Sequence, residues 1–168
     1  MATIKRHFDM GAAQLPATNY PEFRKEVGTS YPYGVYYFDP STDQAIFFKF
    51  KISNYGSGNP NLNIVWVGTG AVVSGDVVFS CAIGAITPDV DTSSISTKAL
   101  ASAQTVTDSH LGTTADREMK TTIAVSNLDS VAADDFVILK FSRAASNGSD
   151  NYSVICGLVD LELTWSDQ

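Results

Sequence analysis

Cysteine and histidine are scarce in this 168-residue chain, with two of each. Cys81 and Cys156 are far apart in sequence, as are His7 and His110, so there are no closely spaced Cys/His pairs of the kind that bind zinc. Two cysteines are also too few for a disulfide-stapled secreted fold. Both lie in apolar, strand-like runs, which favours reduced, buried thiols over a disulfide between them. His110 falls in a polar stretch, where we expect a solvated side chain.

Basic residues and long apolar runs are also lacking. Eleven Lys and Arg face 18 Asp and Glu, which gives a formal net charge of −7 and a pI near 4.6. A nucleic-acid-binding protein needs a basic face, so we expect no nucleic-acid partner. No apolar run approaches the roughly 18 residues of a membrane span, and the charges of residues 1–9 are not followed by an apolar segment. We therefore expect neither a membrane partner nor a signal peptide.

The motifs of common enzyme classes are absent. Gly68-x-Gly70 lacks the lysine of a phosphate-binding loop, no Gly-x-Ser-x-Gly motif occurs, and two histidines leave little for a catalytic triad. Asp160 and Glu162 share one strand face, which suits a solvated face better than two carboxylates facing each other across a glycosidase cleft. We predict no enzyme activity, no catalytic residue, no cofactor and no metal site. A hydrolase using Asp160 or Glu162 is the least favoured alternative.

The composition is typical of β-strands. Val and Thr each occur 15 times, whereas Leu occurs 9 times and Glu 4 times. β-Branched residues suit a pleated sheet, and good helix formers are scarce. In residues 44–52, Phe48 and Phe50 alternate with Lys49 and Lys51, which indicates a strand with one buried and one solvated face.

Turn clusters divide the chain into strands, predicted at 34–38, 44–52, 62–67, 76–86, 118–126, 135–143 and 152–165, with one more within 97–107. The last strand changes facing near Gly157, which indicates a bulge or a crossing between sheets. Residues 87–116 form a long polar stretch, and loops of this length are usually functional or contain a short element. We predict an all-β fold, an antiparallel β-sandwich with a jelly roll of about eight strands over residues 34–168.

The first 33 residues differ from the rest of the chain. They carry a formal charge of +1, which leaves −8 on the other 135. Pro16, Pro21 and Pro32 interrupt any long helix, and two of them follow a tyrosine, which favours extended backbone. We predict that residues 1–33 form an extended N-terminal arm that leaves the sandwich, and a first edge strand with a frayed end stays open as the alternative.

Aromatic side chains raise the question of sugar binding. Tyr36, Tyr37, Phe47, Tyr55 and Trp66 could stack on sugar rings, but most of them alternate along strands as core residues do. Core packing is therefore the favoured interpretation.

Residues 121–143 combine a Thr-rich strand, an Asp-containing turn, an Ala-Ala-Asp-Asp turn and an apolar strand that ends in Arg143. This pattern resembles a hairpin of small structural proteins of tailed bacteriophages. Residues 36–50 are similar to the opening hairpin of those proteins, and residues 65–79 are also similar. The resemblance covers residues 34–165 and is one of fold rather than of catalytic motifs.

The resemblance implies a jelly-roll virion protein, often trimeric. The favoured hypothesis is a capsid cement or decoration protein that binds the major capsid protein on the outer capsid surface as a homotrimer and stabilises the shell. The N-terminal arm would then contact neighbouring subunits through Arg6, Phe8, Tyr20, Phe23 and Arg24, and the loop 87–116 would contact other subunits. The alternative is a tail- or fibre-associated jelly roll that binds a receptor or a glycan, and fold alone does not separate the two.

Overall fold

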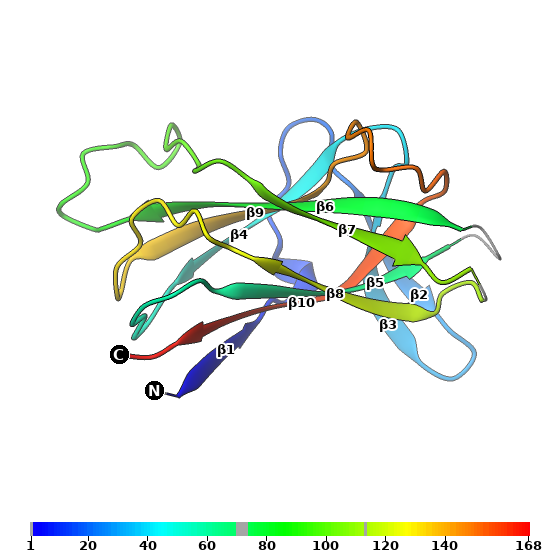
Figure 1. Ribbon diagram of the computed structural model, residues 1–168, viewed down its shortest axis with the longest axis horizontal. Coiled ribbons are helices and arrows are strands. Elements are labelled where there is room, and N and C mark those ends of the chain that lie inside the picture. Colours follow the sequence, from blue (N-terminus) through cyan, green and yellow to red (C-terminus); the bar gives the residue numbers. More distant parts are fainter. Residues whose placement is uncertain (1, 70–73, 113) are drawn as a thin grey trace.

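The computed structural model describes residues 2–69, 74–112 and 114–168, which form ten strands and one short 3-10 helix in two antiparallel sheets (Figure 1). The first sheet has the order β2-β3-β10-β5-β8, with β1 also paired to β10, and the second has the order β4-β9-β6-β7. In these described residues, no helix is long and apolar enough to cross a membrane. The elements are β1 (Thr3–His7), η1 (Met10–Ala12), β2 (Glu22–Val27), β3 (Pro32–Phe38), β4 (Gln44–Lys51), β5 (Asn61–Gly68), β6 (Gly75–Ile86), β7 (Gln104–His110), β8 (Glu118–Ala124), β9 (Phe136–Arg143) and β10 (Cys156–Ser166).

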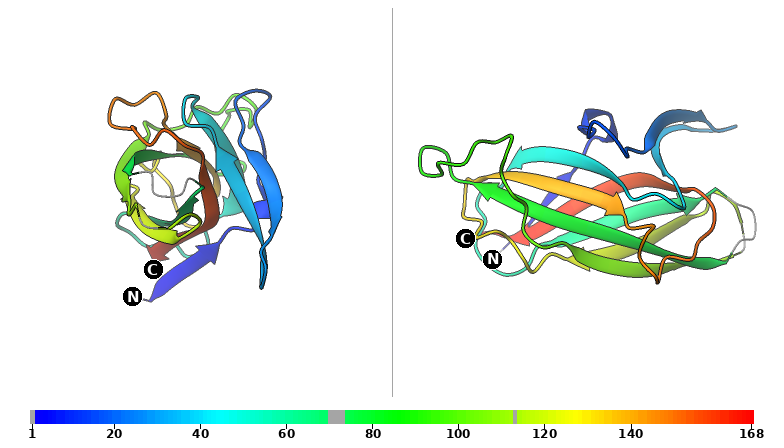
Figure 2. Two further views of the ribbon diagram at one scale, coloured as in Figure 1. Left: turned by 90° about the vertical axis from the view of Figure 1, so that its right-hand side faces the viewer. Right: turned by 90° about the horizontal axis from the view of Figure 1, so that it is seen from above.

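The eight strands from β3 to β10 form a jelly roll. Their pairs are nested, with β3 on β10, β4 on β9, β5 on β8 and β6 on β7, so the chain is one long hairpin that has been rolled up. The pairs β10–β5 and β9–β6 then join these strands into two sheets. Seen along the long axis, the strands surround a common interior (Figure 2, left). The predicted jelly-roll β-sandwich of about eight strands is confirmed.

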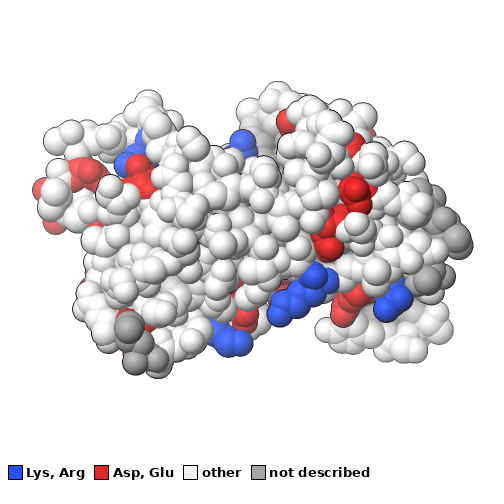
Figure 3. Space-filling model, viewed as in Figure 1, with Lys and Arg blue, Asp and Glu red and all other residues white. Residues whose placement is uncertain are grey.

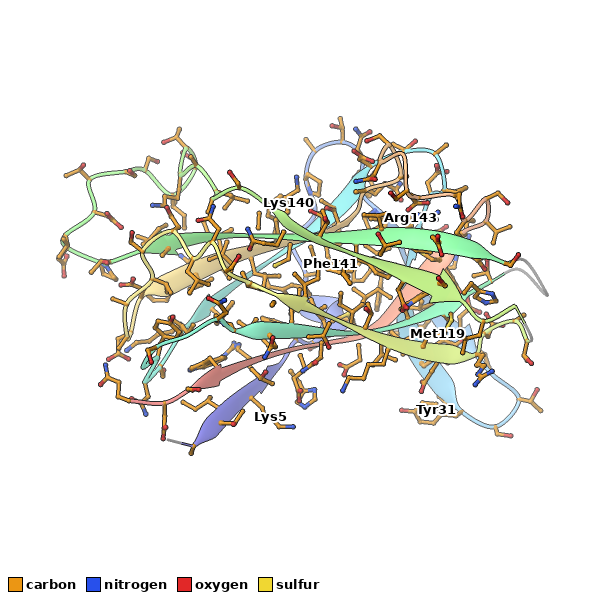
Figure 4. The ribbon with its side chains drawn as sticks, in the orientation of Figure 1. Lys5, Tyr31, Met119, Lys140, Phe141 and Arg143 are labelled. Atoms are coloured by element: carbon orange, nitrogen blue, oxygen red, sulfur yellow. The ribbon has the colours of Figure 1, made fainter. Side chains whose placement is uncertain are left out.

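The core lies between the two sheets and follows the predicted alternation. Along β4, Phe48 and Phe50 are buried whereas Lys49 is exposed. Side chains of the two sheets meet in the interior, where the rings of Phe38 and Phe141 pack edge-on with centroids 5.7 Å apart. Figure 4 shows Phe141 in this central position. Burial of large apolar side chains from both sheets is the main favourable contribution to folding.

The first 33 residues do not leave the sandwich as an arm. β1 pairs with β10 over all five of its residues, and β2 pairs with β3, so the boundary expected after residue 33 falls inside β3. Phe8 and Met10 are buried in the core, and the ring centroid of Phe8 lies 4.7 Å from that of Phe48. Paired backbone groups and buried apolar side chains hold the segment in place. The edge-strand interpretation describes β1 correctly.

Two segments expected to be hairpins connect the two sheets instead. Within residues 121–143, β8 belongs to the first sheet and β9 to the second, and within residues 36–50 the same is true of β3 and β4. A corner between packed sheets carries the same alternation as a hairpin, because one face of each strand is buried in both cases. The local pattern therefore identified the strands but not their partners.

The irregularity expected in the last strand is confirmed. The register of β10 against β5 shifts between Leu158 and Asp160, which leaves Val159 as the extra residue of a bulge. The strand expected within residues 97–107 is β7. It spans Gln104–His110 and so lies further along the chain than expected. The segment before it, residues 87–103, projects as a loop at one end of the sandwich (Figure 1).

Both cysteines are free and buried, and burial raises the pKa of each thiol to about 12. This agrees with the favoured interpretation of Cys81 and Cys156 as reduced thiols. His110 is not solvated, contrary to expectation, because it is the last residue of β7 and its side chain packs inward. Its ring stacks on that of Tyr152 with centroids 5.1 Å apart, and its Nδ1 accepts a hydrogen bond of 3.0 Å from the Gly112 amide.

Candidate functional site

One hairpin separates from the first sheet and leaves a cleft beside it. β2 and β3 pair over residues 22–27 and 32–37, but β3 pairs with β10 only at residues 36–38. Beyond the bulge at Val159, the edge of β10 pairs with the N-terminal segment instead, beginning with a 3.0 Å hydrogen bond from the Phe8 amide to the Leu161 carbonyl. The outer half of the β2–β3 hairpin therefore stands away from the sheet (Figure 2). We call the space between this hairpin and the β5–β8 side of the sheet the hairpin cleft.

The hairpin cleft has two parts that share Asp116 in their lining. The first part has a volume of about 480 Å³ and includes Tyr20 and Tyr37. The second part has a volume of about 570 Å³ and includes Tyr31 and Tyr33. The charged groups of the lining are the carboxylates of Glu22, Asp39, Asp116 and Glu118 and the guanidinium of Arg24. The cleft thus combines aromatic rings with hydrogen-bond acceptors.

Strand alternation explains which hairpin side chains reach the cleft. Glu22 pairs with Tyr37, and Glu26 pairs with Tyr33, and antiparallel partners lie on the same face. Arg24 lies between the two glutamates on this face, 2.6 Å from Glu22 through its Nη2. The hairpin therefore directs two tyrosines and three charged side chains to one side.

Contacts on the opposite face of the hairpin, and hydrogen bonds of a neighbouring strand, anchor the cleft residues. On the opposite face of the hairpin, the rings of Phe23 and Tyr36 pack with centroids 4.8 Å apart, and Phe23 packs against the core. The Gln44 side chain fixes the entry to the cleft, because its Nε2 donates to the Tyr20 carbonyl at 2.9 Å and its Oε1 accepts from the Asp39 amide at 2.7 Å. These contacts fix the hairpin and the backbone of Tyr20 and Asp39 in position around the cleft.

Tyr33 and Tyr37 stay protonated at neutral pH. The Tyr37 hydroxyl donates to Glu26 at 3.0 Å, and the Arg24 guanidinium lies 5.3 Å from the centroid of its ring. Burial, followed by the hydrogen bond to Glu26, raises the pKa of Tyr37 above its usual range. Burial and the negative charge of Asp116 also raise the pKa of Tyr33. Both side chains therefore offer a neutral ring and a phenol hydroxyl.

Two carboxylates of the cleft are held in their ionised form. The hydrogen bond from Arg24 lowers the pKa of Glu22, and hydrogen bonds from the hydroxyl and amide of Ser41 lower the pKa of Asp39. Near neutral pH these groups are acceptors for hydroxyl or ammonium donors. A general acid would need a raised carboxyl pKa, so these two groups are suited to binding rather than to proton donation.

The five residues predicted to contact a capsid do not form one surface. Tyr20 and Arg24 both line the hairpin cleft, whereas Phe23 lies on the opposite face of the hairpin. Arg6 lies over a ring of β4, 5.1 Å from its centroid. Phe8 is buried, so its side chain is not available to a partner. For the other four residues, a role in capsid binding stays a prediction.

Core packing, rather than stacking on sugars, is the favoured interpretation of five aromatic residues, and it holds for most of them. Tyr36, Tyr55 and Trp66 are buried in the core, and Phe47 is half-buried on the second sheet. Tyr37, of these five, lines the hairpin cleft.

Sequence reasoning missed several residues of the cleft, among them Tyr33, Asp116 and Glu118. Tyr33 is in phase with Tyr37 along β3, so alternation could have placed both on one face. Asp116 and Glu118 lie about 80 residues further along the chain, before and at the start of β8. No local pattern indicated that they would face the hairpin, because their position depends on the path of β10 between them.

The acidic pair considered for a hydrolase lies on the outer face of the first sheet. His7 bridges the pair, with Nε2 2.8 Å from Glu162 and Nδ1 3.6 Å from Asp160. Asn63 also donates to Glu162 at 3.0 Å. The two carboxylates are thus neighbours that share a partner. In the part of the chain that the structure describes, no three His, Cys, Asp or Glu side chains gather to hold a metal ion.

Comparison with known proteins finds similarity only among solved structures. No protein-family model and no curated protein matches the chain. The family 11 carbohydrate-binding module from Clostridium thermocellum, in complex with a β-1,3-1,4-mixed-linked tetrasaccharide, is 8% identical with a TM-score of 0.49, and the match covers 99% of this chain and 90% of that chain. TmCBM61 in complex with β-1,4-galactotriose is 10% identical with a TM-score of 0.39, and the match covers 98% and 88% of the two chains. A carbohydrate-binding module of the β-sandwich superfamily is 8% identical with a TM-score of 0.42, and the match covers 96% of this chain but 56% of that chain. These neighbours are β-sandwich carbohydrate-binding modules, and similarity this low carries no argument about the ligand of this chain.

Proposed function

We propose that this protein binds a glycan in the hairpin cleft and is not itself catalytic. The observation that carries the proposal is the open cleft, whose lining combines four tyrosines with four carboxylates. Concave sites with aromatic walls and a few fixed polar groups are typical of small-ligand binding. The function is thus closer to the glycan-binding alternative than to capsid cement.

Sugar chemistry matches both kinds of group in the cleft. A pyranose ring has an apolar C–H face that packs against an aromatic ring, and its hydroxyls donate to carboxylates. Tyr20 is 49% exposed and Tyr31 is 73% exposed, so their rings are accessible without rearrangement. The two parts of the cleft lie next to each other through Asp116, which gives room for more than one sugar unit along the hairpin.

Tyr20→Ala and Tyr37→Ala test the proposal. The wild type is screened on a glycan array, and the best oligosaccharide is then titrated by calorimetry into the wild type and each variant. An aromatic contact contributes about 0.5–1.5 kcal/mol, so each variant is expected to bind about 2- to 10-fold more weakly. Phe136→Ala is the matched control, because Phe136 is 38% exposed on β9 and lines neither part of the cleft. Absence of saturable binding by the wild type, or equal losses in all three variants, would contradict the proposal.

Attachment to a phage particle is a second candidate, favoured by the projecting loop 87–103. This loop exposes Val90 by 72% and Ile95 by 52%, and exposed apolar side chains on a projecting loop suit contact with another protein. A homotrimer bound to the major capsid protein on the outer capsid surface stays a prediction of the resemblance. Co-sedimentation with particles and counting of copies per particle test it, since a capsid protein is present in hundreds of copies and a tail protein in few.

A further inference from the structure

The lining of the hairpin cleft has an excess of negative charge. Four carboxylates and one guanidinium leave a formal charge of −3. The guanidinium of Arg24 is already bound to Glu22 at 2.6 Å, so its charge is matched within the lining. Arg117 lies between Asp116 and Glu118 in sequence but lines neither part of the cleft. On the face shown in Figure 3, a group of acidic side chains lies on the right-hand half, with basic side chains below it.

This negative charge acts at the aromatic rings where a ligand would lie. Asp116 and Glu118, together with Glu26, contribute to the raised pKa of Tyr33. Asp116 also contributes to the raised pKa of Tyr37, on the other part of the cleft. Asp116 lines both parts of the cleft, together with Tyr37 in the first part and Tyr33 in the second, so a ligand that contacts either tyrosine also lies near a carboxylate.

We infer that the hairpin cleft prefers glycans that carry protonated amines, binds neutral glycans more weakly, and binds glycans with carboxylate or sulfate groups most weakly. This inference rests on the proposed glycan binding and adds the charge class of the ligand. An ammonium group donates charge-assisted hydrogen bonds to carboxylates, whereas a uronic acid meets like charges. Exposed carboxylates are screened by water and salt, so the preference is one of affinity and is not absolute.

The experiment compares three oligosaccharides of equal length. These are a glucosamine oligomer with free amines, an N-acetylglucosamine oligomer and a galacturonate oligomer, each titrated at pH 6, where most of the glucosamine amines are protonated. The glucosamine oligomer is expected to bind about 2- to 5-fold more tightly than the neutral oligomer for each exposed ion pair that it forms. The advantage should shrink between about 0.1 M and about 1 M salt, as the screening length falls from about 10 Å to about 3 Å.

Asp116→Asn is the decisive variant, and Asp89→Asn is its matched control. Both residues are exposed and both have positive φ, 58° and 64°, a conformation that asparagine tolerates, so the substitution has the same local cost at both sites. Each variant removes one negative charge, but Asp89 lies in the loop 87–103, outside the cleft. Asp116→Asn should weaken binding of the glucosamine oligomer more than binding of the neutral oligomer, because the asparagine keeps an acceptor oxygen but loses the charge, whereas Asp89→Asn should change neither.

The possible failures are distinguishable. If the neutral or the anionic oligomer binds as tightly as the glucosamine oligomer, or if both variants act alike, the inferred charge preference is wrong and glycan binding stands. If no glycan in this series or on the array binds saturably, the proposed function and the inference both fail.

Discussion

Removal of the Asp150 carboxylate, as in Asp150→Ala, should destabilise the protein more than most single substitutions. The side chains of Arg143 and Asp150 are 0% and 1% exposed, and the carboxylate accepts two hydrogen bonds from the guanidinium, 2.7 Å from Nη2 and 3.0 Å from Nε. Asp150 also accepts from the Val78 amide at 3.0 Å. The alanine variant would leave a guanidinium and an amide buried without this acceptor. Figure 4 shows Arg143 at the end of β9.

The expected magnitude follows from the burial of the pair. Breaking a fully buried ion pair by removing one partner costs about 3–5 kcal/mol, because the remaining charge is left uncompensated. For a chain of this length, each kcal/mol lowers Tm by about 2–4 °C, so Tm should fall by about 6–20 °C. Arg143 also donates to the carbonyls of Tyr152 and Val154, next to Ile155 in the cleft lining, so glycan affinity should fall as well.

Urea denaturation and thermal scans of Asp150→Ala measure this cost. Lys51→Ala is the control, because Lys51 and Asp134 form an ion pair of 3.0 Å whose side chains are 51% and 60% exposed. Solvent screening limits such a pair to about 1 kcal/mol or less. A loss of less than about 1 kcal/mol in Asp150→Ala, equal to that of the control, would refute the reasoning from burial.

Two further predictions concern the interior. Gly68→Ala should lower Tm strongly or prevent folding, because a Cβ at this position would collide with the His110 ring. A variant with wild-type thermal stability would contradict this prediction, because it would show that the ring can move aside. Cys81 and Cys156 should resist a thiol reagent at pH 8 in the folded protein and react once denaturant is added, because burial raises the pKa of both thiols to about 12. Rapid labelling of the native protein would contradict this second prediction.

Alternation along each strand made the strands and their buried faces predictable. Phe48 and Phe50 were assigned to the buried face of their strand from period two alone, and the bulge near Gly157 was indicated by the change of phase along the last strand. The composition likewise predicted the type of domain. Basic residues, helix formers and cysteines are all scarce, which indicates an acidic all-β domain without disulfide staples. These properties depend on neighbours in sequence, so no knowledge of distant contacts was needed.

The partners of the strands were decided by tertiary structure. β1 pairs with β10, so residues 3–7 lie against residues 162–166 at the other end of the chain, and no local pattern distinguishes such an edge strand from a free arm. The same holds for the corners at 36–50 and 121–143, which have the alternation of hairpins but join two sheets. The hairpin cleft exists because the bulge at Val159 turns the edge of β10 from β3 to β1. Asp116 faces Tyr37 only after the chain has rolled up, since their approach depends on long-range pairing and not on the residues beside them.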